Sequence, residues 1–163
     1  WELDTVESGK GDKTCLFVFT ERQTREELIF KADGKNQQCL LKILNRLERN
    51  LTAPIFRETF KTITCDNGVE FLDMDGMEKS YFNKVLKRTK VYYCHPYNAC
   101  ERGSNENANK LIRRWIPKGA FIKDFTDKYI KDIQEWMNNY PRKIFNYLSS
   151  YEYKAVSQSI RMD

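Results

Sequence analysis

The order of hydrophobic periods along the chain constrains its fold more than any other feature. Three strand-like runs come first, at residues 1–7, 14–21 and 26–32. Short connections join them, and the first, SGKGDK, has two glycines that are typical of a turn. From Asn36 to about Asn50 the apolar residues then recur at helical spacing. This order predicts an antiparallel meander of three strands followed by a helix.

Strand and helix patterns alternate in the middle of the chain. We expect TAPIFRET (52–59) to be a loop and KTITCD (61–66) to be a fourth strand. Residues 74–88 have helical spacing, and TKVYYC (89–94) has the pattern of a fifth strand. The helix would direct four apolar side chains inward, those of Met77, Tyr81, Phe82 and Val85. The helix expected over 36–50 lies between the third and fourth strands, which is typical of a crossover, so those flanking strands should pair in parallel.

Two further helices are expected after the fifth strand. Ser104 or Asn105 can cap a helix that ends before Pro117. Its apolar stripe would be Ala108, Leu111, Ile112 and Trp115. Residues 127–139 give the last helix. Together these patterns predict one α/β domain over residues 1–163, with a five-stranded mixed sheet and helices on both faces.

Basic residues are concentrated in the second half of the chain. The 163 residues have a net charge of +5, but residues 1–81 hold 12 basic and 15 acidic residues. Residues 82–121 alone hold 9 basic and 2 acidic residues. Such a sector is typical of a protein that binds a polyanion, and equally of a solvated charged surface.

Several classes of protein are disfavoured by composition. No run of about 18 apolar residues is present, so no membrane-spanning helix is expected. The N-terminus lacks the basic and apolar regions of a signal peptide. Five cysteines have no disulfide-scaffold spacing, and we expect Cys15 and Cys65 to be core residues. A reducing, cytoplasmic setting fits this pattern.

Three acidic residues are candidates for a metal site. Asp4 lies within the first strand, where Asp is disfavoured, and Asp66 ends the fourth strand. If these strands are parallel neighbours, the two carboxylates lie close together and repel unless a cation separates them. Glu106 shares one helical face with Lys110 and Arg113, away from the apolar stripe. Considered alone, Glu106 is better explained by an i,i+4 salt bridge with Lys110, and the other two acids favour the metal site.

The motifs together resemble a known family. They are WELDTV (1–6), TCDNGVEF (64–71), PYN (96–98) and RGSNENANKLIRRWIPKG (102–119), with ERQTR (21–25) and NNYPRK (138–143). This set, in this order, is similar to the catalytic core of bacterial DDE transposases, closest to the insertion-sequence 30 family. The resemblance implies the ribonuclease-H-like fold of retroviral integrases. It also assigns the metal-binding and catalytic acids of the family to Asp4, Asp66 and Glu106.

The resemblance implies metal-dependent cleavage of DNA at element ends, followed by 3′-OH strand transfer into target DNA. Two Mg²⁺ or Mn²⁺ ions would be bound per site when DNA is present. No organic cofactor and no membrane are implied, and the active complex would be a homo-oligomer associated with the bacterial nucleoid. The DNA contacts would be Tyr97, Asn98, Arg102, Asn105, Lys110, Arg113, Arg114 and Lys118. The helix-turn-helix region that recognises element ends is not expected within this chain.

The chain departs from the family pattern at several positions. It has Cys100 and Glu101 where Trp-Gln is usual, and Met74 where a His is common. The segment between the second and third acids is also longer than usual. These departures keep open a degenerate remnant that binds DNA without cutting it. A ribonuclease-H-type nuclease that cuts RNA–DNA hybrids shares the same metal chemistry and is a further alternative.

Overall fold

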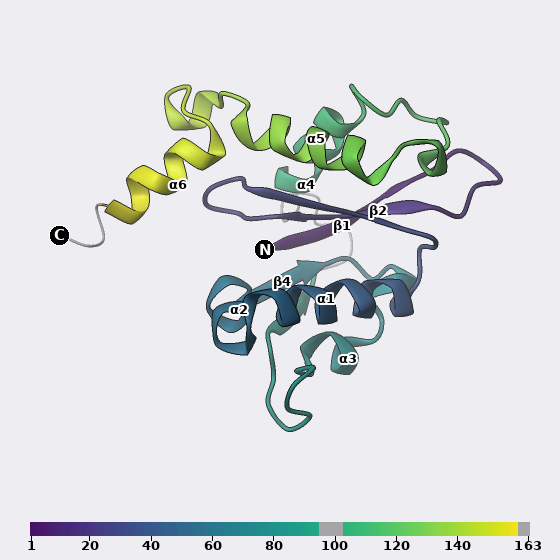
Figure 1. Cartoon of the computed structure of the whole chain (residues 1–163), viewed down its shortest axis with the longest axis vertical. Helices are drawn as coiled ribbons and strands as arrows, with labels where there is room; N and C mark the ends of the chain where they lie inside the picture. The colour runs from purple at the N-terminus through teal and green to yellow at the C-terminus, as the bar shows by residue number, and fades with distance from the viewer. Residues whose placement is uncertain (95–102, 160–163) are drawn as a thin grey trace.

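A five-stranded mixed sheet forms the centre of the molecule (Figure 1). The structure is a computed structural model and describes residues 1–94 and 103–159. The strands are β1 (Glu2–Glu7), β2 (Cys15–Thr20), β3 (Glu27–Ala32), β4 (Thr62–Cys65) and β5 (Lys90–Tyr93). Their order in the sheet is β3-β2-β1-β4-β5. The first three are antiparallel, as the sequence predicts, and β4 is parallel to both β1 and β5. The expected pairing of the third strand with the fourth is wrong, because β2 and β1 lie between them in the sheet.

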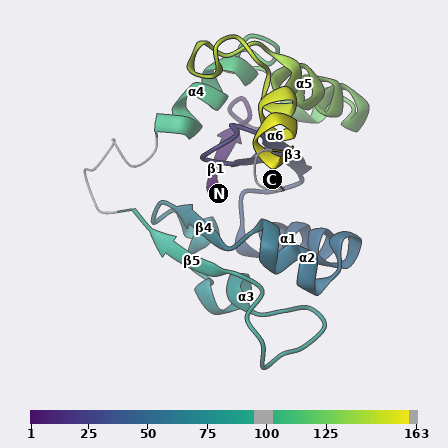
Figure 2. The ribbon, with the colours of Figure 1, turned by 90° about the vertical axis from the view of Figure 1, so that its left-hand side faces the viewer.

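Helices cover both faces of the sheet (Figures 1 and 2). One face carries α1 (Gln37–Leu51), α2 (Ala53–Thr59) and α3 (Met74–Glu78). The other face carries α4 (Gly103–Ile112) and α5 (Asp127–Asn139), and α6 (Ser150–Ser159) follows α5. Short 3-10 helices are η1 (Val69–Phe71), η3 (Ile122–Asp124) and η4 (Lys143–Phe145). Within the described ranges, no helix has the length and apolar character needed to cross a membrane.

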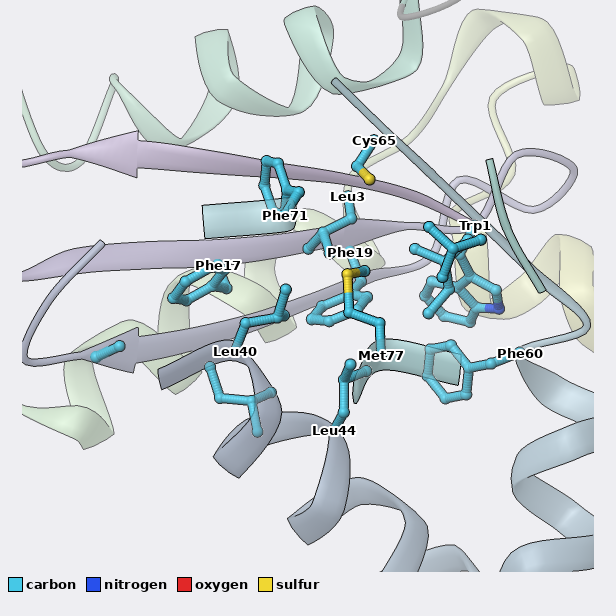
Figure 3. Packing of buried hydrophobic residues seen from close by; sticks show 14 of the residues in the cluster. Trp1, Leu3, Phe17, Phe19, Leu40, Leu44, Phe60, Cys65, Phe71 and Met77 are labelled. Atoms are coloured by element: carbon cyan, nitrogen blue, oxygen red, sulfur yellow. The ribbon is translucent and has the colours of Figure 1, made fainter. Parts of the chain in front are cut away.

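Every residue of β2 is buried, and all of them except Thr20 are apolar, because both faces of the strand are covered. Side chains alternate across a strand, so Phe17 and Phe19 face the α1–α3 layer. Leu16 and Val18 face the α4–α5 layer. Figure 3 shows the first of these two cores, in which the rings of Trp1 and Phe60 stack at 4.7 Å. The sheet is therefore a buried platform with a packed core on each side.

The segment predicted as the TAPIFRET loop is instead α2. Pro54 lies in its first turn, where a missing N–H is tolerated. Phe56 is fully buried, and its ring stacks on Phe60 at 4.7 Å. Burial of this aromatic residue stabilises a helix that is too short to show a clear period in the sequence.

The helix predicted over 74–88 is also wrong beyond Glu78. Residues 79–88 form a loop that is closed by an isolated antiparallel bridge between Lys79 and Lys87. The expected inward residues Tyr81, Phe82 and Val85 are exposed by 49, 57 and 89%. The side chain that enters the core from this segment is Arg88, which is 1% exposed.

Helix α4 is shorter than predicted. It begins at Gly103 and ends at Ile112, and turns continue the chain toward Pro117. Ala108, Leu111 and Ile112 are buried as expected. Trp115 is 39% exposed and contacts the ring of Trp136 edge-on at 5.3 Å, because it lies beyond the helix end.

Candidate active site

Strand pairing brings Asp4 and Asp66 together at the centre of the sheet. Glu2 of β1 is the parallel partner of Thr64 of β4. The same register, continued by two residues, places Asp4 alongside Asp66, which directly follows β4. The carboxyl ends of parallel strands are a common place for ligands in α/β proteins. The parallel pairing of β1 with β4, on which the predicted closeness of the two acids depends, is therefore present.

The turn after β4 has no room for a side chain at Gly68. The Asp66 Oδ1 atom accepts a hydrogen bond from the Gly68 N–H at 2.9 Å. A Cβ on Gly68 would lie 2.9 Å from that Oδ1 atom and 2.7 Å from Glu70 Oε2. Both distances are too short for ordinary contacts, so glycine is needed to keep the two carboxylates in place.

Glu70 is a buried acid beneath this turn. It is 2% exposed, and its Oε1 atom accepts a hydrogen bond from the Thr5 hydroxyl at 3.0 Å. The Lys35 ammonium lies 3.3 Å from the same oxygen. The other oxygen, Oε2, is buried without a partner among residues 1–94 and 103–159. Glu70 thus connects β1 to the turn that carries Asp66 and offers a further oxygen near it.

The start of α4 is fixed to β1 by a buried carboxylate. Glu2 is 1% exposed, and its Oε2 atom accepts a hydrogen bond from the Asn105 backbone N–H at 3.1 Å. A negative charge is favourable at a helix N-terminus. The side chain of Asn105 is itself buried, at 1% exposure. The expectation that Asn105 contacts DNA stays a prediction, and its side chain is buried in this structure without DNA.

Asn109 joins α4 directly to the first acid. Its Nδ2 atom donates a hydrogen bond to Asp4 Oδ2 at 2.8 Å. Its Oδ1 atom is buried and has no hydrogen-bond partner in the described part of the chain. The sequence analysis did not single out Asn109. The available signal was its position three residues after Glu106, which places it on the same helical face.

Glu106 is exposed on the outward face of α4, as predicted. It lines a shallow cleft of about 490 Å³ together with Asn109, Lys110, Arg113 and Arg114. Among the residues that the structure describes, no three His, Cys, Asp or Glu side chains are close enough to share a metal ion. The register of β1 with β4, continued past the end of β4, would set Asp4 beside Asp66, and Glu106 lies one helical turn from Asn109, which binds Asp4.

The other residues predicted to contact DNA differ from one another in their exposure and in the groups they contact. Arg113 donates from Nη2 to the Glu7 carbonyl oxygen at 2.9 Å, and this bond turns it toward the end of β1. Arg114 lies over the ring of Tyr140, 5.8 Å from its centre. Lys110 and Lys118 are exposed. Tyr97, Asn98 and Arg102 lie outside the described residues.

The core cysteines are unsuited to nucleophilic chemistry. Cys15 and Cys65 are both 1% exposed, as expected from their apolar surroundings. Burial raises the pKa of the Cys15 thiol to about 12, so the thiolate does not form near neutral pH. The groups gathered at the carboxyl ends of β1 and β4 are instead oxygen donors, which suit hard divalent cations.

Solved structures identify the fold as that of integrase catalytic cores, which is ribonuclease-H-like. The catalytic core domain of BIV integrase matches 100% of this chain and 97% of its own chain, with a TM-score of 0.64 and 15% identity. A chain of the simian T-cell lymphotropic virus intasome with the PP2A regulatory subunit B56 gamma matches 93% of this chain and 52% of its own, with a TM-score of 0.65 and 14% identity.

Curated relatives are insertion-sequence transposases. The transposase for IS4351 of Bacteroides fragilis is 36% identical over 151 residues, which are 93% of this chain and 43% of the relative. The probable transposase for IS1161 of Streptococcus salivarius is 34% identical over 161 residues, or 98% and 42%. The transposase InsI for IS30C of Escherichia coli (strain K12) is 29% identical over 152 residues, or 93% and 37%.

These comparisons confirm the resemblance to insertion-sequence transposases, including those of insertion-sequence 30 elements. The chain spans about two fifths of the length of these relatives. No protein-family model matches the chain.

Proposed function

We propose that this chain is the catalytic core of a DDE-type transposase, which cleaves DNA at element ends and transfers the 3′-OH end to target DNA. The observation that carries the proposal is the parallel pairing of β1 with β4, whose continued register would set Asp4 beside Asp66, together with the hydrogen bond that ties α4 to Asp4 through Asn109. The similarity to transposases along nearly the whole chain supports it. DNA, a homo-oligomeric active complex and a place in the bacterial cytoplasm at the nucleoid belong to the same proposal.

Asp4, Asp66 and Glu106 would hold two Mg²⁺ or Mn²⁺ ions when DNA is bound. Three features of these residues suit divalent metal ions. Their donors are all oxygen atoms, the register would make the two aspartates adjacent, and Gly68 leaves free the space that a Cβ would occupy beside Asp66. Bound there, such cations activate water and neutralise charge that develops on a phosphate. Because the three acids do not form a group in this structure, the proposal includes an approach of Glu106 to the aspartates when DNA binds.

The protein's own groups would orient the reacting strand. Asn109 holds the Asp4 carboxylate by its hydrogen bond, which restricts rotation of that side chain. Lys110 and Arg113, on the same cleft as Glu106, offer positive charge for backbone phosphates. These contacts position DNA without reading its sequence.

The test compares Glu106→Gln with Glu58→Gln, the same substitution at an exposed residue of α2 on the opposite layer. Glu106→Gln should abolish Mg²⁺-dependent strand cleavage and leave DNA binding nearly unchanged, while Glu58→Gln should cleave normally. Cleavage retained in Glu106→Gln would remove Glu106 from the site. DNA binding without cleavage in the unmodified chain would favour the degenerate remnant, and cleavage confined to RNA–DNA hybrids would favour the ribonuclease-H-type nuclease.

A further inference from the structure

A second cleft, of about 500 Å³, lies on the other side of α4 from the carboxylates. We name it the basic cleft. One wall is a stripe of α4 side chains next to the stripe that carries Glu106, namely Ser104, Asn107, Leu111 and Arg114. The remaining walls come from Arg25 in the turn between β2 and β3, and from residues 140–147 after α5. Its volume is within the range of ligand sites, roughly 300–1,000 Å³.

The basic cleft is strongly positive. Four cations line it: Arg25, Arg114, Arg142 and Lys143. Among the described lining residues the one carboxyl group is that of Glu27, which is 1% exposed, accepts a hydrogen bond from the Thr20 hydroxyl at 2.6 Å and lies 3.9 Å from the Arg142 guanidinium. Burial raises the pKa of Glu27 to about 8, and the four cations outnumber this carboxyl group in either of its protonation states. The charge of the lining suits an anionic ligand.

Buried hydrogen bonds hold the walls of the basic cleft together. Arg142 is 8% exposed and donates to the Arg25 carbonyl oxygen at 3.1 Å and to the Ser150 hydroxyl at 3.0 Å. The Ser150 hydroxyl donates to the same carbonyl at 2.9 Å. The turn at Arg25 is therefore fixed to the segment that follows α5 and to the start of α6, so these walls of the cleft are preformed.

One buried donor in the basic cleft lacks an acceptor. Arg25 Nη1 is buried and makes no hydrogen bond within residues 1–94 and 103–159. Buried donors are nearly always paired, so an unpaired one at the wall of a cleft indicates a ligand with an acceptor. Arg114 and Lys143 are exposed at the same cleft and can reach an anion as well.

Aromatic rings accompany these cations. Tyr140 lies beneath the Arg114 guanidinium, with 5.8 Å between Cζ and the ring centre. Tyr147 also lines the basic cleft and is 69% exposed. Cations together with exposed aromatic rings bind nucleotides, because phosphates pair with the cations and bases stack on the rings.

We propose that the basic cleft binds one backbone phosphate and the adjoining base of the DNA strand that passes over α4 from Glu106. Arg25, Arg114 and Lys143 pair with the phosphate, and the base stacks on Tyr147. The DNA strand would cross only a short distance between the two clefts, because both clefts are lined by Arg114 and lie on adjacent stripes of α4. This inference rests on the proposed function, since it takes DNA as the polyanion.

The test measures binding of fluorescein-labelled DNA, as duplex and as single strand, without divalent metal. The variants are Lys143→Glu and Tyr147→Ala, both at exposed side chains, and the matched control is Lys128→Glu at the far end of α5. Lys143→Glu should weaken binding of both DNAs about tenfold and lower the slope of log affinity against log salt by about one. Tyr147→Ala should weaken single-strand binding more than duplex binding. Lys128→Glu should leave the salt slope unchanged.

Normal affinity and salt slope in both cleft variants, with normal binding by the unmodified chain, would overturn the basic cleft as a DNA site and leave the proposed function intact. Equal losses of DNA affinity in Lys143→Glu and Lys128→Glu would also overturn it, because the effect would then come from the net charge of the protein and not from the basic cleft. An unmodified chain that binds neither DNA would overturn both proposals.

Discussion

Asp4 is a carboxylate on the central strand of a buried sheet, where a charge needs a polar partner or a cation. Asn109 supplies one partner, and the neighbouring Asp66 adds a repulsive charge. The turn that carries Asp66 depends on Gly68, whose missing side chain leaves space for two carboxylates. The positions of the carboxylates in the site thus depend on a few contacts, each of which a single substitution can remove.

Gly68→Ala tests the space around Asp66. The backbone of Gly68 has φ −60 and ψ 146, which alanine adopts without strain, so the expected effect is steric. The added Cβ would displace the Asp66 and Glu70 carboxylates. We expect Mg²⁺-dependent cleavage to fall about 100-fold, as for small misplacements of catalytic groups. Single-turnover cleavage rates measure this; an unchanged rate in a folded variant would show that the turn tolerates bulk.

Glu27→Gln tests the buried carboxyl group of the basic cleft. Burial raises the pKa of Glu27 to about 8, whereas the unfolded chain loses this proton near pH 4.5. The folded state thus binds the extra proton between these pH values, and stability falls as pH rises through that range. Glutamine removes the effect, so its stability advantage should grow from pH 5 to pH 8, by at most about 1.4 kcal/mol per pH unit. Urea denaturation at both pH values measures it, and parallel pH profiles would contradict the account.

At the scale of elements, the loop at 79–88 shows where hydrophobic spacing fails. Its apolar residues fit a helix, yet the buried side chains of the segment are the polar ones of Ser80 and Arg88. Arg88 donates to Asn45 Oδ1 at 2.6 Å and lies 3.4 Å from Glu48 Oε2. Glu48 in turn accepts a hydrogen bond from the Ser80 hydroxyl. A polar network between α1 and the loop fixes this segment. The spacing of apolar residues in the sequence does not reveal such a network.

Arg88→Met tests this network. The substitution leaves the Glu48 carboxylate, which is fully buried, without its cation. Loss of one partner from a buried pair costs about 3–5 kcal/mol in the free energy of unfolding. The double variant Glu48→Gln with Arg88→Met should be more stable than Arg88→Met alone, because no unpaired charge remains. Denaturant melts of the three proteins measure the difference, and a double variant that is less stable than Arg88→Met would count against the network.

The antiparallel meander and the helix layers were predictable because β1–β3 are short strand-like runs separated by turns, and because burial is periodic along α1 and α5. The α2 helix was not, since seven residues are too few to show a period. In the site, Asp4, Asp66 and Glu106 could be named from the sequence, and strand pairing explains two of them. Asn109 and the basic cleft could not, because they depend on contacts between segments about 100 residues apart, such as Asn109 with Asp4 and Arg25 with Arg142.

At the scale of the whole molecule, the sheet fixes the position of the turn after β4 relative to helix α4. The core with α1–α3 supports β4 and its turn, and the core with α4 and α5 supports the helix that carries Glu106. Acidic residues gather at the carboxyl ends of β1 and β4, and basic residues follow α4 and the segment after α5. The charge asymmetry of the sequence thus becomes a basic surface around a small acidic centre.

A crystal structure of the chain with Mn²⁺ and bound DNA tests the central claim most directly. Anomalous scattering should place Mn²⁺ between Asp4 and Asp66, with metal–oxygen distances of about 2.1 Å, and should show Glu106 coordinating from α4. Mn²⁺ absent from these carboxylates while DNA occupies the cleft at Glu106, or Mn²⁺ bound only elsewhere, would contradict the account.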